Sequence, residues 1–358
     1  MPPRPAAAVS WSVRSRVSES LGRRSTIRDV AARAGVSIKT VSRVFSEEAK
    51  VKPATREAVL KVAAELDYHV NIAARSLASR RSYLIGVINA NPSPNYLNDL
   101  HNGAVDRLHG TRYRLIILPL ETTQYRGKVL ALARASGLGG IVLSPPVSDD
   151  NQTLDELLSA GLPFSRIGPM NRPGIAPEVL MDDAAAAQHM TEHLIELGHR
   201  DIAVIQGVPG HASNKLRLEG FRRAMANAGL KVRPEWILGG MYTFESGLDA
   251  GRRLLAGSPA PSAIFAFNDD MAAGVITAAH ERELTIPDEV SIVGFDNSMV
   301  ASVVWPTLTT IHQPIFQMAR MATDALLARI DGGLAPQRVT MPFELIVRNS
   351  SGKPRPRR

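Results

Sequence analysis

The sequence predicts an α/β protein with a small N-terminal module of three helices, a short linking helix, and a large two-lobed body of parallel sheets flanked by helices. Three observations predict this fold. Basic charge is gathered at one end of the chain, apolar residues recur at helical spacing within the first 70 residues, and strand-like runs alternate with amphipathic helices beyond Tyr83.

We expect five segments along the chain: a disordered basic arm at 1–24, the three-helix module at 25–70, the linking helix at 71–82, the body at 83–351 and a basic tail at 352–358. The body contains more strand candidates than one compact sheet holds comfortably. We therefore expect a first lobe of about 83–182 and 314–342, and a second of about 183–312 and 343–351.

The composition is that of a globular protein, with 44% hydrophobic residues in 358. The chain has no cysteine, so disulfides, thiol nucleophiles and thiolate metal sites are excluded. No run approaches the roughly 20 apolar residues of a membrane helix, and the basic N-terminus lacks the apolar stretch of a signal peptide. We expect a cytoplasmic protein without a membrane span.

The net charge of +8 is unevenly distributed. Residues 1–82 hold 16 Lys and Arg against 7 Asp and Glu, whereas the other 276 residues hold 26 against 27. A basic end on a neutral body is the pattern expected of a surface that binds nucleic acid. The alternative is an ordinary solvated face.

The basic end has the signals of three consecutive helices. Thr26 can cap the first helix with Asp29 in a capping box, Gly35 ends it, and Ser37 can cap a second helix. A third helix begins at about Pro53. The residues expected to pack between the three helices are Ile27, Val30, Ala31, Ala34, Val41, Val44, Val59, Val62, Ala63 and Leu66.

The body has six clear strand candidates, each between helical stretches. They read LIGVI, RLIILPL, GIVLSP, DIAVIQG, AIFAFN and VSIVGFD. Such alternation favours βαβ units and therefore parallel sheets, in which ligands bind beyond the carboxyl ends of the strands.

The segment from Thr26 to Asn71 contains the run D-V-A-x-x-A-G-V-S-x-x-T-V-S-R-V and resembles the DNA-binding head of the lactose-repressor/galactose-repressor family. The run covers both helices and the turn of a helix-turn-helix, so it is far more specific than a generic helical pattern. The resemblance implies a transcription regulator, expected to be a repressor. It would bind double-stranded operator DNA as a homodimer at the nucleoid.

In such a head the second helix reads base edges in the major groove. Lys39 and Arg43 can donate to guanine and Ile38 can contact a thymine methyl group. We place four further side chains at phosphates or helix caps: Thr26, Ser37, Thr40 and Ser42. The alternative for each of these residues is an ordinary exposed helix position.

After Asn71, itself assigned to DNA binding, the run IAARSLAS resembles the family's hinge helix. The resemblance implies that two such helices form on DNA and lie in the minor groove, where Leu77 wedges between base pairs. Arg75 and Arg80 are expected to contact phosphates. The alternative is a plain linker helix with Leu77 packed on the body.

The body resembles the same family's periplasmic-binding-protein-like core, most clearly in HLIELGHRDIAVIQG, FNDDMAAGV and SIVGFDNS followed by PTLTTIHQP. The resemblance implies that a small-molecule effector, expected to be a sugar, binds between the lobes. Its inducer or corepressor role stays open. The implied effector-binding residues are Asn95, Tyr96, Asp182, Arg217, Tyr242, Asn268, Asp296 and Gln313. Alternatively, Asp182, Asn268 and Asp296 cap helices and loops.

Two other function classes, a secreted solute-binding protein and an enzyme, are alternatives to a transcription regulator. A secreted solute-binding protein would share the body, but the head and the missing signal peptide oppose it. An enzyme would need a nucleophile with its base or a phosphate loop, and the sequence offers neither; Gly137–Gly140 precedes a strand rather than following one. The run from His189 to His193 matches an inverted zinc-protease motif but lacks a third ligand. We expect no metal and no cofactor.

Overall fold

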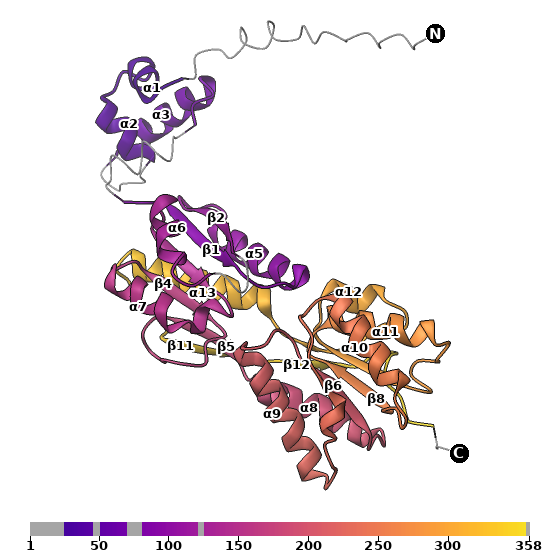
Figure 1. Cartoon of the computed structure of the whole chain (residues 1–358). Coiled ribbons are helices and arrows are strands. Elements are labelled where there is room, and N and C mark those ends of the chain that lie inside the picture. Colours follow the sequence, from indigo (N-terminus) through magenta and orange to yellow (C-terminus); the bar gives the residue numbers. More distant parts are fainter. Residues whose placement is uncertain (1–24, 46–50, 70–80, 121–124, 356–358) are drawn as a thin grey trace, which may run out of the picture. The chain divides into compact units, whose positions relative to one another are not determined.

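The computed structural model describes residues 25–45, 51–69, 81–120 and 125–355. The chain divides into two compact units, Met1–Arg81 and Ser82–Arg358 (Figure 1). We call these units the head and the body. The expected arm, most of the linking helix and the last three residues of the tail lie outside the described residues.

The head contains three helices, α1 Ile27–Arg33, α2 Ile38–Phe45 and α3 Pro53–Glu65. Thr26 and Asp29 form the predicted capping box at the start of α1, and Gly35 adopts a φ of 64° in the turn before α2. The three helices pack around Val30, Ala31, Val41, Val44, Val59 and Ala63. The predicted three helices and their apolar faces are confirmed.

The first lobe of the body is a six-stranded parallel sheet in the order β11-β5-β4-β3-β1-β2. Its strands are β1 Leu84–Asn89, β2 Arg114–Pro119, β3 Gly140–Leu143, β4 Phe164–Ile167, β5 Glu178–Met181 and β11 Arg338–Met341. The helices around it are α5 Pro94–Leu108, α6 Val129–Ala135, α7 Asn151–Ser159 and α13 Ile315–Ile330. A 3₁₀ turn, η1, spans Val147–Asp149.

The second lobe is a six-stranded sheet in the order β12-β10-β9-β8-β6-β7, in which β12 is antiparallel to β10 and the other pairs are parallel. Its strands are β6 Ile202–Ile205, β7 Ile237–Leu238, β8 Ala263–Ala266, β9 Ser291–Asp296, β10 Thr309–His312 and β12 Glu344–Ile346. The helices around it are α8 Asp183–Glu196, α9 Ala212–Asn227, α10 Phe244–Ala256, α11 Asp269–Glu281 and α12 Met299–Val303.

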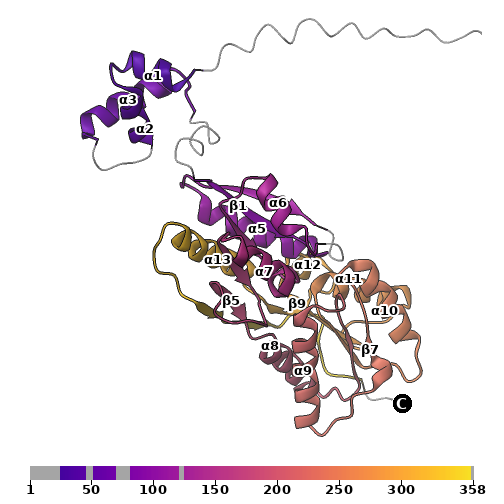
Figure 2. The same cartoon turned by 60° about the vertical axis from the view of Figure 1, so that its left-hand side comes forward.

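The chain passes between the lobes three times, from β5 to α8, from β10 to α13, and from β11 to β12. The two lobes lie side by side in both ribbon views (Figures 1 and 2). Strands β6 and β8 are buried along their whole length, as expected of parallel strands covered on both faces. All six predicted runs are strands, and the predicted two-sheet body is confirmed.

Candidate functional site

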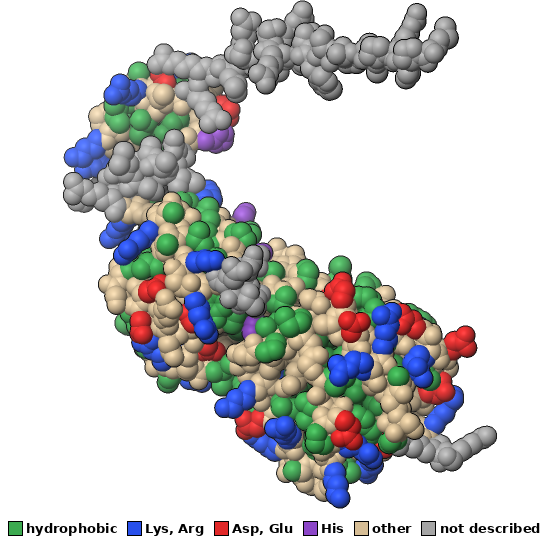
Figure 3. Space-filling view, viewed as in Figure 1, with side chains coloured by type: hydrophobic (Ala, Val, Ile, Leu, Met, Phe, Trp, Pro, Cys, Tyr) green, Lys and Arg blue, Asp and Glu red, His purple; other side chains and the backbone are tan. Residues whose placement is uncertain are grey.

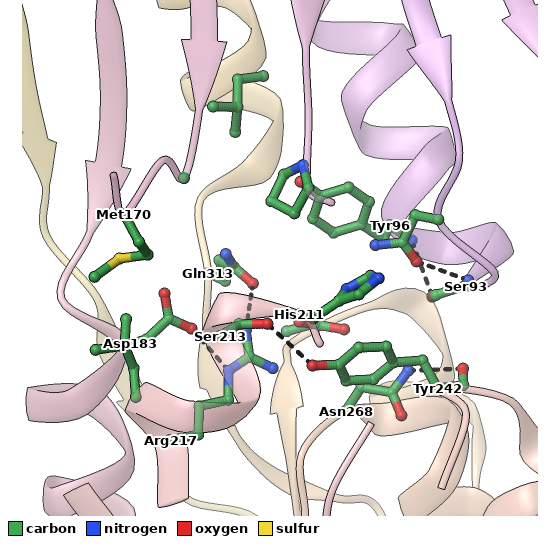
Figure 4. A pocket seen from close by; sticks show the side chains of 16 residues that line it. Ser93, Tyr96, Met170, Asp183, His211, Ser213, Arg217, Tyr242, Asn268 and Gln313 are labelled. Atoms are coloured by element: carbon green, nitrogen blue, oxygen red, sulfur yellow. Dashed lines mark hydrogen bonds and ion pairs between the residues drawn. The ribbon is translucent and has the colours of Figure 1, made fainter. Parts of the chain in front are cut away.

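A cavity lies between the two lobes of the body, with about 570 Å³ of free space that is partly open to solvent (Figure 4). Its walls are built at the carboxyl ends of the strands. Pro145 follows β3, Asp183 follows β5, His211 follows β6 and Asn268 follows β8. Parallel sheets present their ligand sites at this edge, because there the loops leave the strands and backbone polar groups are free.

Arg217 on α9 is the centre of the polar wall. Its Nε donates to Asp183 Oδ1 over 2.7 Å, its Nη1 donates to the Phe267 carbonyl, and its Nη2 donates to Gln313 Oε1 over 3.2 Å. The guanidinium also lies 3.5 Å from the centroid of the Phe295 ring. Burial lowers the pKa of Arg217, but Asp183, Tyr242 and Asp296 together more than offset this, so the guanidinium stays charged.

Tyr242 follows β7 and is held from both sides. Its φ of 60° is unusual for an aromatic residue, and its hydroxyl donates to Asn214 Oδ1 over 2.8 Å and lies 3.0 Å from Ser213 Oγ. Its ring centroid is 5.7 Å from that of His211. The ring is therefore a fixed part of the wall, with its polar end already satisfied.

His211 precedes α9 and is buried, with 4% of its surface exposed. Its Nε2 has no hydrogen-bond partner among the described residues. Burial, reinforced by the nearby Arg217 charge, lowers the pKa of His211 to about 4. The imidazole is thus neutral near pH 7 and leaves one ring nitrogen unused.

Asp296 is the last residue of β9 and has a φ of 118°, a backbone conformation that residues other than glycine rarely adopt. Burial raises the pKa of Asp296 well above its usual range, although Arg217 acts in the opposite direction. Burial and the Asp296 and Asp183 carboxyls raise the pKa of Tyr96, which keeps its phenol neutral.

Two further acids lie behind the cavity. Asp269 accepts from Ser298 N over 2.7 Å and from Thr310 Oγ1 over 2.6 Å, and burial raises the pKa of Asp269 to about 7. Asp270, on the second lobe, accepts from Ser93 Oγ over 2.6 Å and from Asn95 Nδ2 over 2.7 Å, both on the first lobe. Asp270 therefore ties the two lobes together.

The structure brings together six of the eight predicted effector-binding residues. Those that line the cavity are Tyr96, Arg217, Tyr242, Asn268, Asp296 and Gln313. The Asn268 amide is largely occupied, because its Oδ1 caps α11 at Met271 N and its Nδ2 donates to the Tyr242 carbonyl. Asn268 therefore both lines the cavity and caps a helix, as the alternative predicted.

Asp182 and Asn95 lie elsewhere than expected. The exposed Asp182 caps α8 by accepting from Ala185 N over 2.9 Å, and the next residue, Asp183, faces the cavity. Asp182 is the N-cap of α8 and Asp183 is its first residue, so the two adjacent acids have different surroundings. Asn95 contacts Asp270 across the lobes, and its neighbour Tyr96 lines the cavity.

Sequence reasoning missed several lining residues. They include Asn91, Ser93, Ile167, Gly168, Met170, Asp183, His211, Ser213 and Leu216. Most lie just after strands, so strand ends were the signal that could have found them. A buried charge beneath this wall was also missed: Arg166 on β4 donates to the carbonyls of Ser148, Asn171 and Arg172, and so fixes the loop that carries Met170.

The head presents α2 as a polar surface. Ile38, Lys39 and Ser42 are exposed, and Arg43 is half-buried. Ser37 caps α2 by accepting from Thr40 N over 3.1 Å, and the two hydroxyl oxygens are 2.9 Å apart. Thr26 uses its hydroxyl in the α1 cap. The remaining predicted DNA-binding residues, Asn71, Arg75, Leu77 and Arg80, lie outside the described residues.

The two histidines of the run that matches an inverted zinc-protease motif, His189 and His193, have different contacts. The His189 ring lies against Phe343 with 6.0 Å between centroids, whereas His193 Nε2 lies 3.2 Å from Ser351 Oγ. Over residues 25–45, 51–69, 81–120 and 125–355, no helix is long and apolar enough to cross a membrane.

Two family models match this chain, one within the head and one within the body. The model of bacterial regulatory proteins of the lacI family matches residues 26–71, and that of the periplasmic binding protein-like domain matches residues 191–351.

Similar proteins extend the match over nearly the whole chain. The HTH-type transcriptional regulator DegA of Bacillus subtilis (strain 168) is 33% identical over 92% of this chain and 98% of its own length. The lac repressor dimer bound to operator and the anti-inducer ONPF is 26% identical, with a TM-score of 0.78 over 92% of this chain and 100% of its own. The CelR–cellobiose complex is 29% identical, with a TM-score of 0.69 over 91% of this chain and 100% of its own. The chain therefore belongs to the lacI family of bacterial transcription regulators.

Proposed function

We propose that this protein is a homodimeric repressor of carbohydrate-utilisation genes. It binds a pseudo-palindromic operator, and a small-molecule effector, a sugar, changes that affinity from the cavity between the lobes. The observation that carries this proposal is the union in one chain of a helix-turn-helix head with a body whose two lobes enclose a polar cavity. Such a regulator works in the cytoplasm, at the nucleoid.

The DNA-binding part of the proposal is supported by the exposed face of α2. Ile38 and Lys39 lie in its first turn, where a recognition helix meets base edges, and their side chains are exposed. The excess of Lys and Arg over Asp and Glu lies in the first 82 residues, which supplies attraction to phosphates. On the body, basic and acidic side chains are intermingled over the face shown in Figure 3.

The effector part of the proposal is supported by the chemistry of the cavity. Arg217, Gln313 and Asp296 offer donors and acceptors of the kind that bind vicinal hydroxyl groups. The CelR structure, which is similar over 91% of this chain, holds cellobiose. The CelR likeness makes a sugar the first class to test.

The homodimer is supported by an apolar surface on the second lobe. Met299 and Val303 on α12 are 74% and 69% exposed, and the neighbouring Trp305 is 75% exposed. Exposed apolar side chains gathered in this way are typical of association surfaces. A second copy of this chain is the partner we propose for them, because the similar lac repressor binds its operator as a dimer.

Coupling between the cavity and DNA would pass through the segment 71–82. Ligand binding changes the relation between the lobes and thereby the arrangement of the paired hinge segments, on which entry of Leu77 into the minor groove depends. A coupling free energy of about 1–3 kcal/mol is enough to change operator occupancy substantially. Whether the effector releases or strengthens DNA binding follows from the lobe arrangement that it favours.

The test is selection of genomic fragments by the full chain, followed by gel shifts with excess random competitor DNA. We expect a small set of fragments that share a pseudo-palindrome and whose binding responds to a sugar. Equal affinity for every fragment, with and without added metabolites, contradicts the proposal. A solute-binding protein would bind a sugar but no operator, and an enzyme would turn its ligand over.

A further inference from the structure

The cavity holds one cationic side chain, and its charge is already neutralised. Among the lining residues that the structure describes, Arg217 is the only Lys or Arg. Each of its three nitrogens donates a hydrogen bond within the protein, and the Asp183 carboxylate lies 2.7 Å from Nε. A phosphate or carboxylate on a ligand therefore finds no free cation to offset its desolvation.

A further acidic group in the wall, Asp296, disfavours an anion. The Asp296 carboxyl lines the cavity, and the hydrogen bonds within the described residues do not use it. Burial already raises the pKa of Asp296, and a ligand anion beside it would raise it further, so an anion can be held there only with a proton on the carboxyl; hydroxyl groups hydrogen-bond to the carboxyl in either form. Asp296 is the last residue of β9, at the strand end that lines the cavity.

The wall also contains a neutral group that is not used. His211 Nε2 is buried without a partner in the described residues, although a ring nitrogen can donate or accept. A buried polar atom left unpaired costs free energy, and a ligand that pairs it recovers that cost. His211 therefore favours a ligand with a hydroxyl group at this end of the cavity.

The part of the wall that the first lobe supplies is less polar. It includes Tyr96, Pro145, Ile167 and Met170 together with the polar Asn91 and Ser93, whereas the second lobe supplies Arg217, Asn268 and Asp296. A ring with a C–H face and an edge of hydroxyl groups matches these two parts of the wall, because its face packs on apolar side chains while its edge is hydrogen-bonded.

From this arrangement we infer that the effector is an uncharged polyhydroxylated ring compound, and that His211 Nε2 and the Asp296 carboxyl determine its specificity. Sugar phosphates and sugar acids are excluded because Arg217 is already paired with Asp183 and the Asp296 carboxyl disfavours a second acidic group beside it. This inference rests on the proposed function only in taking the cavity as the effector site.

The first experiment pairs neutral sugars with their anionic counterparts. Glucose, ribose and cellobiose are compared with glucose 6-phosphate, ribose 5-phosphate and glucuronate by calorimetric titration of the full chain. We expect at least one neutral sugar to bind, and its anionic counterpart to bind at least about ten-fold more weakly. An anionic compound that binds as tightly as its neutral form overturns the inference, and so does the absence of binding by all three neutral sugars.

Operator binding is measured on the same preparation. If operator fragments are still selected while the neutral sugars fail, the ligand assignment is wrong and the proposed regulator stands. If no operator is selected under any condition, the proposed function itself fails.

The second experiment separates hydrogen bonding by His211 from packing against Tyr242. His211→Phe keeps an aromatic ring but has no nitrogen, whereas His211→Gln keeps a polar group and loses the ring. We expect the bound sugar to lose about ten-fold in affinity with His211→Phe and less than about three-fold with His211→Gln. The opposite order assigns His211 to packing and overturns its role. The exposed His280→Phe on α11 is the matched control and leaves affinity unchanged.

Discussion

The ring of Tyr242 occupies the space in which a side chain at position 207 would lie. A Cβ placed on Gly207 would be 2.0 Å from the Tyr242 Cζ atom, far inside van der Waals contact. Gly207 follows β6 and Tyr242 follows β7, so this contact sets the spacing of two neighbouring strand ends that form the cavity wall. The Tyr242 ring can occupy this position only because residue 207 is a glycine.

Gly207→Ala is therefore expected to push the Tyr242 ring into the cavity. We expect a loss of about 1–3 kcal/mol in the free energy of unfolding, as for an overpacked core, together with weaker effector binding. Gly239→Ala is the control, because a Cβ there has no atom within 4 Å. Thermal unfolding of both variants checks this, and equal melting temperatures would contradict the contact.

Arg217→Met is expected to leave the Asp183 carboxylate buried without its cation. Removal of one member of a buried ion pair costs about 3–5 kcal/mol. Asp183→Asn in the same chain removes the uncompensated charge, so the double variant should recover more than half of the lost stability. Urea unfolding of the two single variants and the double variant measures this coupling. Additive losses would show that the two side chains act independently.

His211 makes the stability of the body depend on pH. Its pKa is about 4 in the folded protein and near 6.5 when unfolded, so the unfolded chain binds more protons between these values. Stability is therefore fully present above pH 6.5 and falls as the pH drops towards 4. Between pH 7 and pH 5 the expected loss from this group is about 2 kcal/mol.

The comparison with His211→Gln isolates this effect from other groups. The pKa of Asp269, raised to about 7, acts in the opposite sense and is present in both proteins. The free energy of unfolding, measured at pH 7 and pH 5, should fall less in the variant than in the original chain. His280→Gln, on an exposed position, should show the original dependence.

Lys39→Ala is expected to relax base preference at one or two positions of the operator. The side chain is exposed in the first turn of α2, where donors reach guanine, and one such contact discriminates by about 1–3 kcal/mol. Lys61→Ala, exposed on α3, is the control for a loss of charge alone. Binding to a library of operator variants distinguishes the outcomes, and a uniform loss over all sequences would make Lys39 a phosphate contact.

Trp305→Asp is expected to weaken dimer formation by placing a charge in the apolar surface formed with Met299 and Val303. Sedimentation at several concentrations should show monomer at concentrations where the original chain is dimeric. Leu334→Asp provides the matched control, since Leu334 is fully exposed after α13. A dimer that is unaffected by Trp305→Asp would assign the association to another surface.

Local sequence signals determined much of this protein. The caps at Thr26 and Ser37, the turn at Gly35 and the apolar spacing of the head lie within a few residues of one another, and helix formation depends on such short-range interactions. Five of the six strand runs of the body are largely buried, and burial on both faces selects continuous β-branched and apolar residues; β2, at the edge of its sheet, is apolar in sequence but partly exposed.

The tertiary structure alone decided which polar groups remain available in the cavity. Asp182 and Asp183 are adjacent acids, but one caps a helix while the other meets Arg217, 34 residues away in the sequence. Asn268 is consumed by its own helix, whereas His211 Nε2 stays unpaired. The sequence determines which polar side chains are present. Whether each of them has a hydrogen-bond partner depends on groups that only folding brings within about 3 Å.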